Sequence, residues 1–270
     1  MDNVGDLKVK ECIRLLEHSV DCRDHIFALK ELQHCVISNQ DFSIDEVQFV
    51  TCTTMLMKEE DFVVELACKL LESLFSGKRL DFQKLPSTAV QDSLSQLAEL
   101  LSFHPNDQVL LQALRLTRAI GLEQSAQLSE FGPVCTLVFH VGRLVEHNND
   151  LVRVASMRAL SSLCSNALVK QEVNRAGVRG SLHRLLLQTE DPSLLVPARE
   201  LMSILMEDGA STLASFPSRG SDSRRPAQCS TLQYPVTRDY AEELVPDGDS
   251  RFLVVRTPVS DYKPSSWGFS

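Results

Sequence analysis

The feature that most constrains this chain is a small residue that recurs inside successive helix-like segments. Neighbours in this series are separated by 39, 46, 43 and 42 positions, and the members are Ala28, Ala67, Ala113, Ser156 and Ala198. A period of this length is typical of helical repeats, in which each unit buries its apolar face only against its neighbours. A small side chain where two helices cross lets their backbones approach. The alternative is coincidence in a helical chain rich in leucine and alanine.

The residues around two members of the series also repeat. The segment Asn106-Asp107-Gln108-Val109 aligns with Asn149-Asp150-Leu151-Val152 at an offset of 43. With the same offset, Arg115 aligns with Arg158. Agreement of polar as well as apolar positions favours a true internal repeat.

The clearest unit covers residues 148–206. A polar turn at residues 148–150 can begin a helix, Gly177 separates a short polar helix from a leucine-rich one, and Asp191-Pro192 precedes a last helix. Glycine suits the bend because it adopts positive φ without strain. This order of three helices resembles one armadillo repeat. The resemblance implies an all-α fold, a right-handed α-solenoid of four to five armadillo/HEAT-like repeats over residues 1–206.

Local signals predict where two of the earlier helices begin and end. A helix over residues 109–120 is expected to end at Gly121, with a separate short helix over residues 125–131. Near residue 45, Ser43 and Glu46 have the spacing of a capping box, so Ser43 is the expected N-cap.

Residues 207–270 have a different composition from the repeats. They contain six of the eleven prolines and several serine clusters, and proline at this density blocks helix continuation. We therefore predict a mostly disordered tail, with a short strand only at residues 252–255. The segment Trp267-Gly268-Phe269 is a candidate linear motif that docks on the solenoid or on a partner.

Composition excludes several classes of function. The net charge of −9 argues against broad contact with nucleic-acid phosphates. No run approaches the roughly 18 apolar residues that span a bilayer, and residues 1–9 show no secretory signal. Eight cysteines in such a chain are expected to be reduced thiols of an intracellular protein in the cytoplasm or nucleus. We expect protein partners, with neither nucleic acid nor membrane.

The sequence contains no pattern that indicates catalysis or a cofactor. It lacks the nucleophile elbow, the phosphate-binding loop and the zinc helix of common enzymes. The best metal candidate consists of Cys22 and His25 with His34 and Cys35. On one helix these pairs lie roughly 14 Å apart, too far for one tetrahedral zinc site. We therefore predict no catalytic, cofactor or metal site, and no enzyme.

The resemblance implies where a partner would bind. In armadillo-type solenoids the last helix of each unit lines the concave face, and known peptide-binding members carry Trp and Asn there. This chain has no Trp in its repeats, which argues against their backbone-clamping mode. The position two residues after each small residue is instead basic in four of five units, at Lys30, Lys69, Arg115 and Arg158, with Glu200 in the fifth.

Two interpretations of these four residues remain open. They are solvated helix positions, where Lys and Arg are common, or they form a basic stripe that attracts an acidic or phosphorylated segment. On the second interpretation the chain is a non-catalytic scaffold or adaptor that binds a partner in its groove. The alternative is an end fragment or obligate subunit of a larger helical-repeat assembly. The oligomeric state is open.

Overall fold

The computed structural model describes residues 4–38, 45–77, 79–80, 84–128, 132–207, 240–247 and 251–258. The chain separates into two compact units, residues 1–216 and residues 217–270. The first is helical and the second contains two strands. No helix in the described ranges is long and apolar enough to cross a bilayer.

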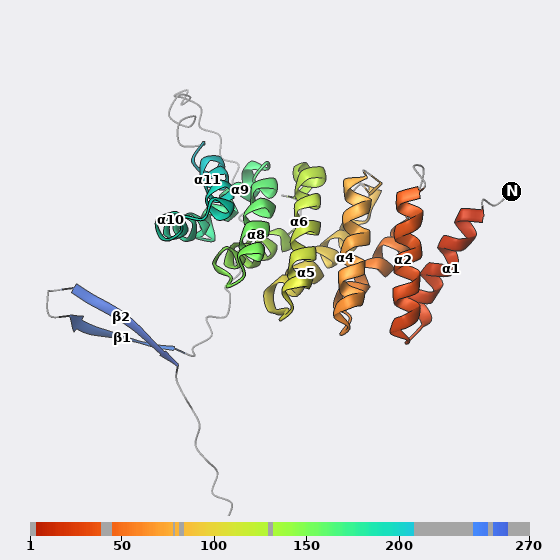
Figure 1. Ribbon diagram of the computed structural model, residues 1–270, viewed down its shortest axis with the longest axis horizontal. Coiled ribbons are helices and arrows are strands. Elements are labelled where there is room, and N and C mark those ends of the chain that lie inside the picture. The colour runs from red at the N-terminus through yellow and green to blue at the C-terminus, as the bar shows by residue number, and fades with distance from the viewer. Residues whose placement is uncertain are drawn as a thin grey trace, which may run out of the picture. The chain divides into compact units, whose positions relative to one another are not determined.

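The helical unit has two rows of helices, and each helix packs on the next in its row (Figure 1). We call the first row the spine; it consists of α2 (Cys22–Ser38), α4 (Asp61–Ser76), α6 (Asp107–Leu128), α8 (Asp150–Leu163) and α11 (Pro192–Met206). The second row consists of α1 (Val4–His18), α3 (Glu46–Thr54), α5 (Ser87–Phe103), α7 (Pro133–Arg143), α9 (Ala167–Arg175) and α10 (Val178–Gln188).

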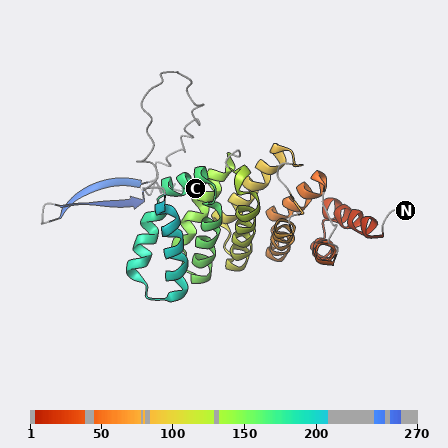
Figure 2. The ribbon, with the colours of Figure 1, turned by 90° about the horizontal axis from the view of Figure 1, so that it is seen from above.

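Figure 2 shows this stack from above. Leucine and valine side chains from both rows form one continuous core along the stack. The all-α solenoid predicted from the sequence is therefore confirmed for the helical unit.

The small residues of the repeat lie where the spine helices pack against one another. All five are fully buried, with 0% of their surface exposed: Ala28, Ala67, Ala113, Ser156 and Ala198. The hydroxyl of Ser156 donates a hydrogen bond to the Arg153 carbonyl oxygen at 2.7 Å, so its polar atom is satisfied inside its own helix. The period read from the sequence is thus a period of helix packing.

Gly121 lies inside α6 and does not end it. A Cβ at this position would lie 2.7 Å from Oγ of Ser162 and 2.9 Å from the backbone nitrogen of Leu163 in α8. The predicted helix end at Gly121 is wrong, because this glycine serves a close approach of two helices. The short helix expected at residues 125–131 is partly the end of α6, and residues 129–131 lie outside the described part of the chain.

Among the described residues, only the last unit has the three-helix form predicted from the sequence, with helices α9, α10 and α11. Gly177 begins α10 with φ of 77°, the left-handed conformation predicted for the bend. Two earlier units instead have a 3-10 turn before the spine helix, η1 (Met55–Met57) and η3 (Leu144–Glu146). The capping box of α3 is formed by Asp45 and Gln48, two residues after the predicted pair, and Ser43 lies outside the described residues.

The second unit contains an antiparallel hairpin. Strands β1 (Tyr240–Asp247) and β2 (Arg251–Pro258) pair so that Tyr240 lies opposite Pro258 and Asp247 opposite Arg251. Strand β2 includes residues 252–255, where the sequence predicts a strand, whereas β1 was not predicted. The predicted motif at Trp267 and most of the predicted disordered tail lie outside the described residues.

Candidate functional site

A groove with a basic end lies between spine helices α6 and α8. It has a volume of about 180 Å³, and eight residues line it: Leu111, Leu114, Arg115, Arg118, Leu151, Val154, Ala155 and Arg158. We call this surface the basic groove. It is the place where the structure brings together two of the four residues predicted from the sequence, Arg115 and Arg158.

Helical periodicity explains why these residues share one groove. On α6, the lining residues from Leu111 to Arg118 recur at spacings of three and four, which place side chains on one helix face. The same spacing on α8 runs from Leu151 to Arg158. In both helices the apolar members precede the arginine, so the groove is apolar toward the helix starts and basic toward the helix ends.

The arginines of the basic groove are not neutralised by neighbours. Among the described residues, none of the three forms an ion pair with a carboxylate. Glu72 on α4 is an acidic neighbour of Arg115 and Arg118. Partial burial raises the pKa of the Glu72 carboxyl, while Arg115, Arg118 and Lys69 act in the opposite direction. The groove therefore carries surplus positive charge on a chain whose net charge is −9.

The other two predicted residues have partners inside the chain. Lys69 lies on α4, and its Nζ is 2.5 Å from Oε1 of Glu65. Lys30 lies on α2, with its ammonium 5.4 Å from the centre of the Phe62 ring. Both are on spine helices, but neither lines the basic groove.

The sequence analysis missed Arg118, which lines the basic groove, and Glu72, which lies near its arginines. Arg118 follows Arg115 by three positions, so helical spacing alone could have placed it on the same face. Glu72 gave no such signal, because its proximity to Arg115 depends on how α4 packs against α6.

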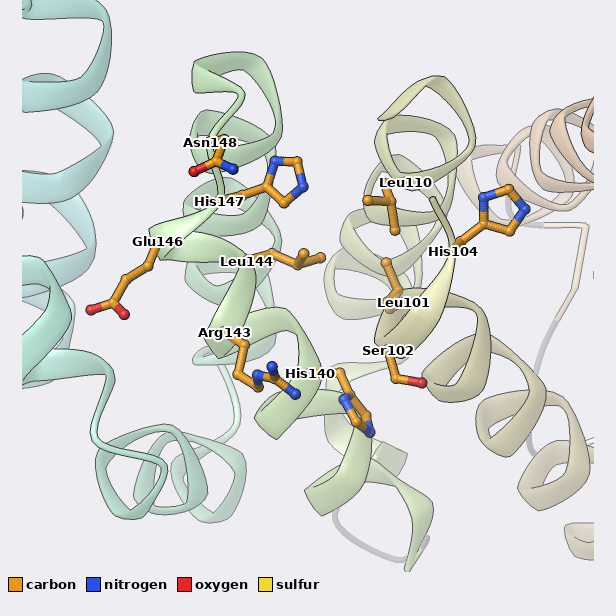
Figure 3. A pocket seen from close by; sticks show the side chains of 10 residues that line it. All are labelled: Leu101, Ser102, His104, Leu110, His140, Arg143, Leu144, Glu146, His147 and Asn148. Atoms are coloured by element: carbon orange, nitrogen blue, oxygen red, sulfur yellow. The ribbon is translucent and has the colours of Figure 1, made fainter. Parts of the chain in front are cut away.

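A second hollow, of about 480 Å³, lies where α5 and α7 meet the turns that lead into α6 and α8 (Figure 3). We call it the rim hollow. Its lining includes His140 and Arg143 of α7 and Ser102 of α5. Burial, with a smaller contribution from Arg143, lowers the pKa of His140, so this imidazole is neutral near pH 7. The buried Nδ1 of His140 has no hydrogen-bond partner within the described residues.

The wall of the rim hollow contains a contact between successive repeats. Nε2 of His147 lies 3.7 Å from Oδ1 of Asp107, and Nδ2 of Asn149 donates to Oδ2 of the same aspartate at 2.7 Å. The Asn149 backbone N–H in turn donates to Nδ1 of His147 at 3.1 Å. A histidine and an asparagine of one unit thus hold the first aspartate of the preceding spine helix, and we call this arrangement the clamp.

The clamp recurs one unit earlier. Nε2 of His104 lies 3.5 Å from Oδ1 of Asp61, and Asn106 donates to Oδ2 of Asp61 at 2.5 Å. Figure 3 shows that His104 and His147 point in the same direction from equivalent turns. These side chains have structural partners. Among the described residues, the His140 side chain contacts the Phe139 ring, edge to face with the ring centres 5.4 Å apart, and the Arg143 side chain forms no ion pair.

In the described part of the chain, neither hollow brings its His, Cys, Asp or Glu side chains close enough together to hold a metal ion. Within the described ranges no group of three or more His, Cys, Asp or Glu side chains gathers. Of the candidate ligands, His25 is buried and its Nε2 lies 2.9 Å from the Ser19 carbonyl oxygen.

Comparisons with known proteins find similarity only at the level of fold. No family model and no curated protein matches this sequence. Two engineered proteins of known structure match it with TM-scores of 0.58 and 0.59 at 17% and 19% identity. They cover 73% and 74% of this chain and 78% and 81% of their own chains.

A computationally designed armadillo repeat protein for modular peptide recognition also matches. Its TM-score is 0.55 at 13% identity, over 72% of this chain and 80% of the designed chain. At such identities the likeness concerns the fold, and this chain has the armadillo-like helical-repeat fold that its sequence resembles.

Proposed function

We propose that this protein is a non-catalytic scaffold or adaptor that binds an extended acidic segment of a partner protein along its spine. The observation that carries the proposal is the basic groove, where Arg115, Arg118 and Arg158 lie together without carboxylate partners among the described residues. Clustered like charges repel one another, and an anionic ligand relieves that repulsion. The eight cysteines support a site of action inside the cell, in the cytoplasm or nucleus.

The repeat sets the expected spacing of the partner's acidic residues. Arg115 and Arg158 are equivalent positions of neighbouring units, and packed helices lie about 8–10 Å apart. An extended chain advances about 3.3 Å per residue, so acidic residues about three positions apart would meet both arginines. Lys30 and Lys69 continue the same row toward the N-terminus and would exchange their internal partners for the ligand. The designed armadillo protein for modular peptide recognition is consistent with this type of ligand.

Charge reversal tests the proposal. Wild-type protein should bind short extended peptides with glutamate at every third position, and its affinity should fall as salt rises. The triple variant Arg115→Glu, Arg118→Glu and Arg158→Glu should lose this binding. The matched control reverses exposed arginines elsewhere, Arg23, Arg179 and Arg199, and should retain it. Equal binding by both triple variants would refute the proposal.

A second candidate function is that of a subunit in a larger helical assembly. The observation that favours it is exposed apolar surface on the first two helices, where Leu7, Phe27 and Ile37 are 69%, 56% and 71% exposed. Light scattering over a range of concentrations tests this candidate. A mass that stays monomeric would exclude self-association through this surface.

A further inference from the structure

We infer that the basic groove binds a phosphorylated serine or threonine that has a large apolar residue close to it in the partner sequence. This inference rests on the proposed function, because it specifies the chemistry of the acidic segment. It follows from the number of guanidinium groups in the groove and from the separation of its apolar and basic ends.

The positive charge of the groove fits a phosphate better than a carboxylate. One carboxylate offers two oxygens and is satisfied by one arginine fork. A phosphoryl group carries a charge of about −1.5 to −2 and three acceptor oxygens. Arg115 and Arg118 lie one turn apart on α6, and Arg158 faces them from α8, so a phosphate between the two helices can accept from each.

The neighbouring carboxylate does not replace such a ligand. Glu72 is close enough to Arg115 and Arg118 for them to influence its pKa, yet it forms an ion pair with neither arginine among the described residues. Arg115 and Arg118 therefore remain available to an anion placed over α6 and α8.

The apolar end of the groove adds the second requirement. Leu111, Leu114, Val154 and Ala155 form its floor, and Leu151 at its edge is 64% exposed. A leucine or similar side chain of the partner would cover Leu151 and remove apolar surface from water. Nucleic acid fits this half of the groove poorly, since no aromatic side chain lines it to stack on bases.

Matched peptides test the inference. We would measure fluorescence polarisation of labelled peptide mixtures with a central phosphoserine, glutamate or serine and a leucine at varied nearby positions. At about 0.15 M ionic strength, the phosphoserine mixture should bind at least about tenfold more tightly than the glutamate mixture. An unlabelled single-stranded oligonucleotide should not displace it.

Variants locate the site. Arg115→Gln, Arg118→Gln and Arg158→Gln should each weaken phosphopeptide binding about tenfold, whereas Arg199→Gln should not. Leu151→Ser should weaken binding of leucine-containing peptides and leave leucine-free phosphopeptides unaffected. Its control is Leu168→Ser, since Leu168 is similarly exposed at 58% but lies on α9 outside the groove.

The outcomes separate this inference from the proposed function. The phosphoserine and glutamate mixtures could bind with equal affinity, and the arginine variants could lose binding of both. That result would overturn the phosphate preference and leave the acidic-segment proposal standing. Binding that is unchanged in all three arginine variants would overturn both. Displacement of the phosphopeptide by the oligonucleotide would overturn the assignment to a protein partner.

Discussion

Replacing Gly121 with alanine adds one methyl group where α6 approaches α8. The new Cβ would lie 2.7 Å from Oγ of Ser162, 2.9 Å from the nitrogen of Leu163 and 3.0 Å from the carbonyl carbon of Ser162. The hydroxyl can rotate away, but the two backbone atoms belong to a packed helix and cannot move alone. The methyl group therefore forces the two helices apart.

Two opposing effects set the size of the change. Alanine inside a helix is more favourable than glycine by about 1 kcal/mol, whereas overpacking in a buried contact costs about 1–3 kcal/mol. The chain offers a matched control at Gly180 in α10, which is exposed and has nothing within 4 Å of a Cβ. Gly180→Ala has the gain in helix propensity without the clash. The free energies of unfolding of the two variants should therefore differ by about 1–3 kcal/mol.

Thermal melts followed by circular dichroism measure this difference. Gly180→Ala should melt slightly above wild type, and Gly121→Ala should melt below Gly180→Ala by about 2–4 °C per kcal/mol. Adding Ser162→Ala to Gly121→Ala should recover only part of the loss, because the backbone contacts remain. Equal melting temperatures for the two single variants would refute the close approach of α6 and α8.

Three further predictions concern stability. Ala113→Leu and Ser156→Leu should each lower the free energy of unfolding by about 1–3 kcal/mol because they overpack the spine, and melts that match wild type would contradict this packing. Deleting residues 212–270 should leave helical content and melting temperature nearly unchanged, and a large drop would show that this segment stabilises the helices. Burial raises the pKa of Cys52 and Cys164 to about 12. Below about pH 9 each thiol is protonated in the folded and in the unfolded chain, so its raised pKa does not affect stability. Above about pH 9 the thiol ionises in the unfolded chain only, so the free energy of unfolding should fall by up to about 1.4 kcal/mol per pH unit for each thiol. Urea titrations at several pH values should show this slope, and Cys52→Ala with Cys164→Ala should reduce it but not abolish it, because burial also raises the pKa of Cys12 and Cys68.

The architecture was predictable because the repeat imposes the same packing requirement in every unit. A small residue is needed at each spine crossing, so Ala28 and Ala198 give the same signal although they lie in the first and last units. Gly177 was likewise predictable, since its positive φ is a local property. Gly121 was misread because a glycine that ends a helix and one that allows a neighbouring helix to approach look alike in sequence.

The candidate site was predictable only in part. Counting from the small residues identified Arg115 and Arg158, which line one groove. The same rule selected Lys69, but its contact with Glu65 depends on side-chain conformation and not on the repeat. Glu72 was missed because contacts between consecutive spine helices set its position, and no periodic pattern in the sequence reports them.

The clamp has a consequence for how the array loses its structure. Asp61 and Asp107 each accept a hydrogen bond from an asparagine of the following unit. Asp150, the equivalent residue of α8, instead forms an ion pair with Arg153 in its own helix. The position equivalent to those asparagines in the last unit is Asp191, whose carboxylate cannot donate a hydrogen bond to Asp150. In a repeat protein each unit is stabilised by its interfaces with the adjacent units, so a unit with a weaker interface is expected to open first. Amide hydrogens of α9 to α11 should therefore exchange faster, by local opening, than those of α4 and α6, whose first aspartates are held by the clamp.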